Sequence, residues 1–435
     1  MRKTLIAVLA GAMAFATVPA AFAKDHSITG FWRVRGMVNN YGAFGGGGFA
    51  DNADPGREID QRFRAKYTLG LNEYVSVTYY GEVDIQYGDA SYATSRNQGG
   101  AIGGDTVNLE TKNLYLDVKI PETPVSARLG LQGFADHWDW TVILADMAGF
   151  TFRAKLEMAD VMAGYFKLQE GDANGLIGNN TEDDIDLWAV QVGVKPPMDG
   201  LKLGLDGLYL NDNDFDGTGN KNLYWVGAHA GYKVAGVDLS GWFAYNFGEA
   251  SSTSDVNAWM VNGKAAYSVA GAGVSLRLFY TPGDDDSDAD QEWFHPVKAT
   301  ETFAMATDGL MIFTPDITWT TLGQYGHAFT DGVYAGNGAW GAILSGSFTP
   351  PAVQAAYVKG AAGYFSTTDG KDNGAQDDDL GFEVAGRVGY KLADAVDLSL
   401  NGAYAWLGDF YAGTGGGGKD PDDAYTAYFM VNVGF

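Results

Sequence analysis

The sequence predicts an all-β fold, a transmembrane antiparallel β-barrel of about 18 strands, with 16 strands as the alternative. Three observations support it: a period-two strand that ends the chain on an aromatic residue, alternating segments repeated along the chain, and connectors that are alternately short and long. After residue 23, no apolar run approaches the ~18 residues that a membrane helix needs. A search for long apolar runs does not detect a barrel, because every second residue of its strands faces water.

Residues 1–23 have the pattern of a secretory leader. Two basic residues open the segment, residues 5–18 are apolar, and an Ala-x-Ala cleavage signal ends at Ala23. We therefore expect a signal peptide that is removed on export and a single barrel domain over 24–435. A retained membrane anchor is the alternative, and the short apolar core disfavours it.

Composition excludes several classes of function. The chain has a net charge of -26 and no cysteine, so disulfide scaffolds, thiolate metal sites and covalently attached haem are excluded. Strong acidity argues against nucleic-acid partners. Much of the charge lies in short acidic runs, at 284–290 and 377–379, which we interpret as solvated loops rather than metal sites.

Strands are expected wherever apolar and polar residues alternate over about ten positions. The first is expected over 26–38 and the last over 422–435, and a clear example between them covers 75–86. Aromatic residues recur near the predicted strand ends on the outward face, as rings at the headgroup level of a membrane do: Tyr67, Tyr79, Tyr87, Tyr280, Tyr390, Trp406 and Phe435. A soluble β-sandwich would need no such bias.

Connectors on one side of the predicted barrel are short, and those on the other side are long. The short ones are 70–73, 120–124, 195–200, 233–236, 349–352 and 392–395. The long ones are 39–56, 87–105, 170–183, 211–221, 283–330, 366–378 and 408–421. This asymmetry is typical of outer-membrane barrels, with periplasmic turns and extracellular loops. The connector over 283–330 is unusually long for a segment without structure of its own.

Several charged residues are predicted to face the interior of the barrel. Alternation leaves basic side chains inward on the first, second, fifth and sixth strands: Arg33, Arg35, Arg62, Arg64, Lys66, Arg128, Arg153 and Lys155. The third strand contributes Glu82 and Asp84 to the same wall. Two interpretations stay open: the charges form salt bridges that only keep the wall wet, or the bases form a cationic ladder that orients and selects solutes.

The connector over 134–147 is more apolar than the others. Because exposing its aromatic and aliphatic residues to water would be unfavourable, we expect it to fold into the barrel as a constriction loop. That placement would set Asp136, Asp139 and Asp146 opposite the arginines and create a transverse field. Packing at a subunit interface and an external lid are the alternatives.

These features together resemble the bacterial porins. More narrowly, Gly130-Leu-Gln-Gly133 and Asp146-Met-Ala-Gly-Phe150 are similar to segments of the homotrimeric porins of sulfate- and metal-reducing bacteria. The resemblance implies a homotrimer in the outer membrane, in contact with lipid and lipopolysaccharide. It also implies a pore in each barrel that the third loop narrows, with the acids of that loop facing the basic wall.

The expected function is a water-filled channel for passive diffusion of ions and small hydrophilic solutes. The alternative is a solute-selective channel, with an anion or sugar bound by Trp138 and Trp140 together with Arg64 and Arg128. An enzyme or an electron-conduit sheath is disfavoured, since the five histidines show no paired metal-ligand spacing and no haem motif occurs. No cofactor is expected, although calcium could bind acidic loops such as 212–217, where Leu223 replaces the bidentate Glu of a calcium loop.

Overall fold

A computed structural model describes most of the chain. The described residues are 25–41, 49–51, 55–91, 98–104, 107–170, 184–213, 221–284, 289–315, 326–371, 374–414 and 418–435. The expected leader lies outside them, as do most of the candidate calcium loop, from 214 on, and part of the first acidic run. Among the described residues, the structure has no helix of the length and apolar character that crossing a bilayer requires.

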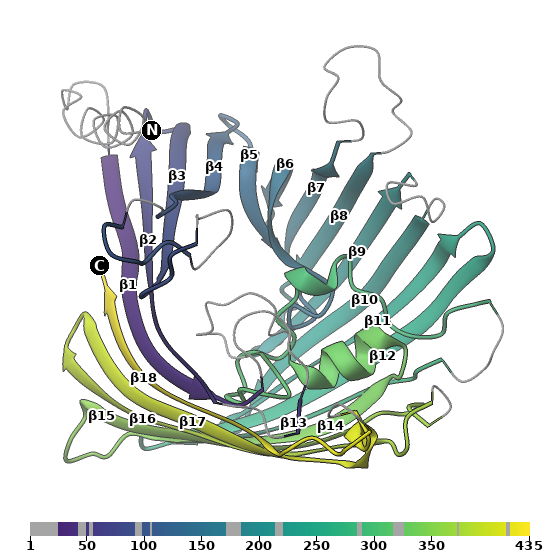
Figure 1. Cartoon of the computed structure of the whole chain (residues 1–435). Helices are drawn as coiled ribbons and strands as arrows, with labels where there is room; N and C mark the ends of the chain where they lie inside the picture. Colours follow the sequence, from purple (N-terminus) through teal and green to yellow (C-terminus); the bar gives the residue numbers. More distant parts are fainter. Residues whose placement is uncertain are drawn as a thin grey trace.

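The described chain forms one closed sheet of 18 antiparallel strands (Figure 1). The first nine strands are β1 (Asp25–Asn39), β2 (Gly56–Gly70), β3 (Val75–Gln86), β4 (Glu110–Lys119), β5 (Val125–Ala135), β6 (Leu144–Lys155), β7 (Ala159–Gln169), β8 (Ile185–Val194) and β9 (Leu201–Asp212). The other nine are β10 (Lys221–Val234), β11 (Val237–Ser251), β12 (Ser254–Val269), β13 (Ala272–Thr281), β14 (Ala339–Phe348), β15 (Ala356–Ser366), β16 (Asp379–Ala393), β17 (Val396–Leu407) and β18 (Ala424–Gly434).

Each strand pairs with its neighbours in sequence, and β18 returns to pair with β1, from Phe31 opposite Gly434 to Asn39 opposite Thr426. The predicted barrel and its 18 strands are therefore confirmed. Closure leaves no unpaired edge among the described strands, which is how a sheet satisfies all its backbone groups in an apolar solvent. The backbone N–H of Gly30 also donates to the carbonyl of Phe435, so the aromatic end of the chain is held against β1.

The two ends of the barrel differ as predicted. At one end, the eight connectors that begin with 71–74 and finish with 394–395 have two to seven residues. At the other end, most connectors are long, and 282–338 between β13 and β14 is the longest among them. The two-residue turn between β11 and β12 is an exception there. Prolines occur in none of the 18 strands, consistent with their loss of a ladder hydrogen bond.

The outer surface is apolar and carries an aromatic belt. Large apolar side chains on it are well exposed, including Leu205 (60%), Val388 (58%) and Leu400 (64%). Rings on adjacent strands stack in a continuous series with centroids 4.6–5.4 Å apart: Phe150, Tyr165, Trp188, Tyr209, Tyr224 and Phe247. Such a surface is unfavourable in water and is typical of a barrel surrounded by lipid.

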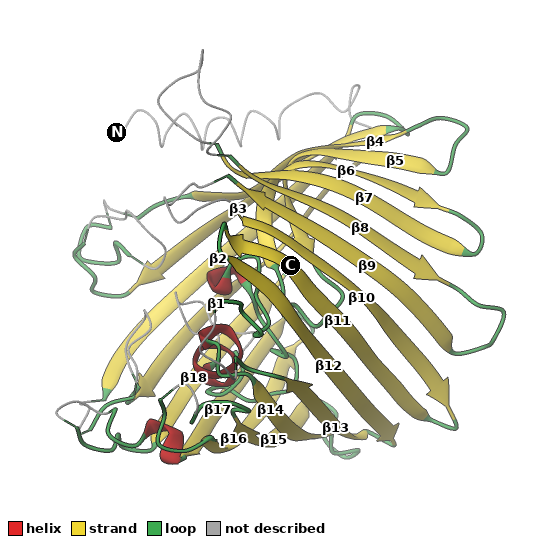
Figure 2. Ribbon diagram, turned by 90° about the vertical axis from the view of Figure 1, so that its right-hand side faces the viewer, coloured by secondary structure: helices red, strands yellow, loops and turns green. Residues whose placement is uncertain are grey.

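Two inward connectors fill part of the interior. The segment between β13 and β14, green in Figure 1, lies within the ring of strands. It contains the short helical turns η2 (Ala299–Glu301), η3 (Ala328–Gly332) and η4 (Val333–Ala335), and helical turns are red in Figure 2. The β5–β6 connector covers only 136–143, so 134–135 and 144–147 of the expected loop belong to strands. Apolar residues of both connectors are buried together, including Trp138, Val142, Phe294 and Phe313.

Candidate functional site

A row of polar side chains crosses the lumen face of five adjoining strands. In register, Arg62 of β2 lies opposite Arg33 of β1, which lies opposite Asn432 of β18. The row continues to Asp397 of β17 and Lys391 of β16. Because residues in cross-strand register share a face of the sheet, all five side chains start from the inner wall.

Carboxylates neutralise part of the predicted basic ladder. The Arg35 guanidinium donates to both oxygens of Asp60, from Nε at 3.1 Å and from Nη2 at 2.5 Å, and both side chains are fully buried. Arg62 makes the same bidentate contact with Asp84, at 2.7 and 2.5 Å, and Arg64 pairs with Glu82. The salt-bridge interpretation therefore holds for three of the predicted bases.

Arg33 is different. Its side chain is only 6% exposed, and its Nε and Nη2 atoms are buried with no hydrogen-bond partner. Its neighbours in the fold include the further cations Arg35, Arg62 and Arg64. A buried guanidinium without an acceptor is unfavourable, and an anion is the group that would satisfy it. No carboxylate pairs with Arg33 in the described structure, so the ladder interpretation stays a prediction for this residue.

Bases from distant strands complete a cavity beside Arg33. The cavity has a volume of approximately 720 Å³ and opens between β1, β2 and the β14–β17 region. Among the described residues, six bases and one carboxylate line it: Arg33, Arg62, Arg64, Lys359, Arg387, Lys391 and Asp397. The phenol of Tyr357 donates to that carboxylate at 2.7 Å, so the acid already has a partner. We call this cavity the basic pocket.

The other predicted bases lie elsewhere on the wall. Arg128 donates to Asp117 at 2.8 Å and lies 4.0 Å above the centroid of the Tyr115 ring, so it is partly neutralised. Lys66 of β2 is half-buried. Arg153 and Lys155 are exposed near the short turn that follows β6. None of these four bases lines the basic pocket.

The acids of the β5–β6 connector do not face the predicted arginines. Asp136 is buried, and its oxygens accept the backbone N–H groups of Trp138, Trp140, Val142 and Ile143 at 2.7–3.0 Å. Its carboxylate therefore holds the connector in shape rather than facing the lumen. Burial raises the pKa of Asp136 to about 6, against the opposing effect of these N–H donors.

Asp139 reaches the far wall of the barrel. It pairs with Arg277 of β13 and accepts the indole N–H of Trp242 of β11 at 2.8 Å. Arg277 also pairs with Asp308 of the β13–β14 segment, and Lys264 of β12 pairs with the same acid. One arginine thus links both inward connectors to the wall, and neither Arg277 nor Asp308 was singled out from sequence.

A second buried carboxylate anchors the β13–β14 segment. Glu383 of β16 is fully buried and accepts the backbone N–H groups of Met311, Ile312 and Phe313 at 2.6–3.2 Å. Residues 310–315, which belong to the expected long connector, are therefore a loop packed inside the barrel.

Two further expectations differ from the structure. Asp146 belongs to β6 rather than to the connector, because residues 144–147 continue the strand. Its carboxylate pairs with Lys112 at 2.6 Å, and Lys112 lies 3.9 Å from Glu82. Trp138 is fully buried, with its indole over Gly227 of β10, so it offers no surface to a solute. The expected grouping of Trp138 and Trp140 with Arg64 and Arg128 therefore lacks Trp138. Trp140 is half-buried, and its carbonyl accepts the backbone N–H of Phe303 in the β13–β14 segment.

Alternation could identify inward residues but not the neighbours that closure creates. The inward parity of Arg387 and Lys391 was readable from sequence, yet their proximity to Arg33 depends on β18 pairing with β1. Among the described residues, one group could hold a metal ion, namely His137, Asp206 and His229. Its members come from a connector and two strands, so the spacing of these residues in the sequence could not predict the group.

Comparison with known proteins supports the fold. No protein-family profile matches the chain, and no curated protein matches it. Among solved structures, OccK8 (OprE) of Pseudomonas aeruginosa is similar, with 13% identity, a TM-score of 0.59 and coverage of 95% of this chain and 99% of that one. The P. aeruginosa outer membrane protein OpdK has 11% identity, a TM-score of 0.58 and coverage of 95% and 100%. OccK2 (OpdF), also from P. aeruginosa and solved in complex with glucuronate, has 11% identity, a TM-score of 0.57 and coverage of 95% and 99%.

Proposed function

We propose that this protein is an outer-membrane channel through which ions and small hydrophilic solutes diffuse passively. An 18-stranded barrel is wide enough to hold an aqueous path between its wall and the inward connectors. The apolar outer surface and its aromatic belt match a membrane setting, and the leader-like residues 1–23 match export. OpdK, whose fold is similar, is described as an outer membrane protein.

The basic pocket is the main evidence for the ion preference of the proposed channel. Arg62 and Arg64 are paired with acids of β3, but Arg33, Lys359, Arg387 and Lys391 still outnumber the one partnered carboxylate of the pocket. The local potential is therefore positive, although the chain as a whole carries a net charge of -26. Local potential at a narrow place, rather than total charge, sets which ions enter. We therefore propose that anions pass more readily than cations of the same size.

A second candidate function is a solute-selective channel with a binding site at the basic pocket. The orphaned nitrogens of Arg33 favour it, because a bound carboxylate would accept the hydrogen bonds that the protein leaves unmade. Two proteins of similar fold were solved with carboxylates, OccK2 with glucuronate and OpdK with vanillate. The site would lie at Arg33, Arg62 and Arg64 rather than at the connector tryptophans.

A homotrimer and contact with lipopolysaccharide also belong to the proposal. The local resemblance to homotrimeric porins of sulfate- and metal-reducing bacteria supports the trimer, with a separate pore in each barrel. The inward connectors would narrow that pore. Chemical crosslinking in detergent, read as three bands of one, two and three chains, tests the assembly, and a single band of one chain would contradict it.

Swelling of proteoliposomes tests the proposed function. Vesicles that hold the refolded protein are placed in isosmotic glucose or potassium glucuronate, two solutes of similar size that differ in charge. Valinomycin is added so that potassium can accompany the anion and charge is balanced. Passive diffusion with anion preference predicts faster swelling in glucuronate, and a plateau as its concentration rises would identify the selective channel. Vesicles that stay as tight as protein-free ones in both solutes would contradict the proposal.

A further inference from the structure

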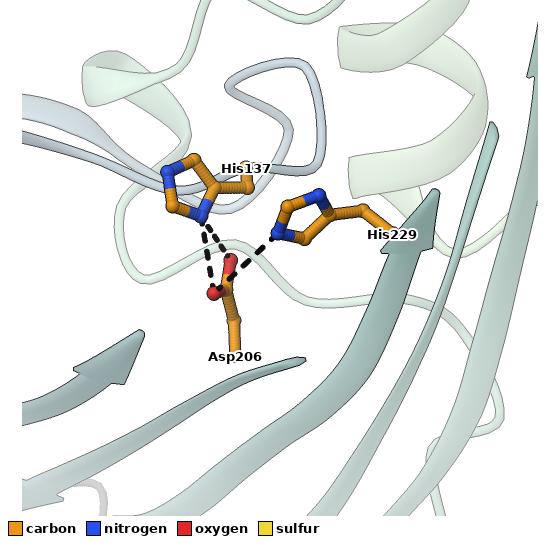
Figure 3. Close-up of side chains that lie close together, drawn as sticks. All are labelled: His137, Asp206 and His229. Atoms are coloured by element: carbon orange, nitrogen blue, oxygen red, sulfur yellow. Dashed lines mark hydrogen bonds and ion pairs between the residues drawn. The ribbon is translucent and has the colours of Figure 1, made fainter. Parts of the chain in front are cut away.

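Three potential metal ligands meet where the β5–β6 connector approaches the wall (Figure 3). His137 belongs to the connector, Asp206 to β9 and His229 to β10. The His137 Nδ1 atom is 3.1 Å from Oδ1 of Asp206 and 3.0 Å from Oδ2, and His229 Nε2 is 4.0 Å from Oδ1. Figure 3 shows both imidazoles turned toward the carboxylate between them.

One glycine makes room for His229 and another for the connector residue next to His137. The His229 ring lies over Gly204 of β9, where a Cβ atom would be 1.9 Å from Nε2. Gly227 of β10 lies directly across from Asp206, and a Cβ there would be 2.9 Å from the Trp138 indole nitrogen. Any other residue at 204 would displace the imidazole from the carboxylate. The wall is therefore shaped to hold His229 in this position.

The group also contains unsatisfied polar atoms. Asp206 is 5% exposed, and its Oδ1 is hydrogen-bonded to His137. Its Oδ2 lies 3.0 Å from the same nitrogen but accepts no hydrogen bond. His229 Nε2 is likewise buried without a hydrogen-bond partner and lies on the side of the ring that faces Asp206. Buried polar atoms without partners are unfavourable, and a cation placed between these two would satisfy both at once.

We propose that His137, Asp206 and His229 form a binding site for a divalent transition-metal ion of the zinc type. Two imidazole nitrogens and a carboxylate oxygen are a ligand set that such ions take, with a fourth position open to water. The three ligand atoms lie within 4.8 Å of one another. Bonds of ~2.0–2.2 Å in a tetrahedral site bring ligand atoms to about 3.3 Å. His137 Nδ1 already lies near that distance from Asp206, and the 4.0 Å between His229 Nε2 and Asp206 Oδ1 has to shorten by less than about 1 Å.

Metal binding would fasten the connector to the wall. His137 stands one residue after Asp136, whose carboxylate shapes the connector, and two residues before Asp139, which already reaches β13. A metal ion would add a link to β9 and β10 and place a positive charge in the aqueous path. Reduced current in the presence of zinc follows, a consequence that rests on the proposed channel function, whereas binding itself does not.

Titration calorimetry with ZnCl2 tests the site directly. The tag-free, refolded full chain is compared with His137→Ala, His229→Ala and the control His26→Ala, which removes an exposed histidine of β1. One site per chain is expected, with affinity weakened at least roughly tenfold in the first two variants and unchanged in the control. Equal affinity in all four proteins, or binding in none, would overturn the proposal.

A fourth variant tests the geometry of the site without removing any ligand. Gly204→Ala keeps all three ligands but pushes the His229 ring away, so the same loss of zinc affinity is expected. Heat-dependent migration in gels verifies that each variant is folded. In bilayers, a protein that binds zinc in this pattern but carries no current would support the site and contradict the proposed function. Current without zinc binding would do the reverse.

Discussion

Arg33 and Arg35 lie two residues apart on the lumen face of β1, and their surroundings give them different roles. Arg35 is paired with the buried Asp60, whereas two nitrogens of Arg33 have no hydrogen-bond partner. A paired arginine contributes little net charge to the lumen. The unpaired arginine is therefore the residue on which solute preference should depend most.

Arg33→Gln is expected to shift ion selectivity toward cations while leaving the barrel folded. The substitution removes a buried charge that lacks an acceptor, so folding should lose little. The measurement is the reversal potential of single channels under a KCl gradient. Lys155→Gln, at an exposed position outside the basic pocket, is the matched control and should move the potential much less. Equal shifts in both variants would contradict the role given to Arg33.

Arg35→Gln is expected to act on stability instead. It leaves the Asp60 carboxylate buried without its cation, a change that costs roughly 3–5 kcal/mol in buried pairs. The midpoint of urea unfolding in detergent or lipid should therefore fall clearly, whereas that of Arg33→Gln should change little. If Arg33→Gln proves the less stable of the two, the assignment of paired and unpaired arginines is wrong.

At the scale of elements, two inward connectors depend on buried carboxylates. Asp136 caps the N–H groups of its own connector, and Glu383 caps those of the β13–β14 segment. Alternation predicted the strands of the wall well, because the period of two is a property of neighbouring residues. It could not predict these caps, since Glu383 and Met311 lie 72 residues apart in sequence.

Glu383→Ala is expected to release the β13–β14 segment and to raise single-channel conductance. The variant removes the acceptor for three buried N–H groups, and each unmet buried group costs roughly 1–3 kcal/mol. Asp394→Ala, which removes an acid in the exposed β16–β17 turn, is the control and should leave the conductance near that of the parent protein. Unchanged conductance in Glu383→Ala would mean that the segment does not narrow the path.

Acidification should loosen the same segment through His295. Burial, and then the nearby Lys221, lower the pKa of His295 to about 3, below its value of ~6.5 in an unfolded chain. Between these two pH values His295 is protonated in the released segment but stays neutral in the packed segment. Packing is fully favoured above pH ~6.5 and weakens progressively as the pH falls toward ~3.

The expected readout is a rise in conductance between pH 7.5 and 4.5 that His295→Phe largely abolishes. Phenylalanine can keep the stacking on Trp293, where the ring centroids are 3.5 Å apart, but it cannot take up a proton. His26→Phe serves as the control, because His26 lies on β1 away from the segment. A pH response of the same size in His295→Phe and in the parent protein would assign the effect to other groups.

At the scale of the whole molecule, closure of the sheet creates the candidate site. The basic pocket needs β1 and β2 on one side and β15 and β16 on the other, strands from opposite ends of the chain. The sequence contained the strand count, the end-to-end asymmetry and the inward parity of Arg33 and Arg35. Cross-barrel partners such as Asp139 and Arg277 depend on how the connectors fold inward, which no local pattern encodes.

Single-channel recording in a planar bilayer under a KCl gradient tests the central claim most directly. The account predicts ohmic current, steps in groups of three, and a reversal potential on the anion-selective side that moves toward cations in Arg33→Gln. A purified, folded protein that carries no current, or a cation-selective current that ignores Arg33, would contradict it.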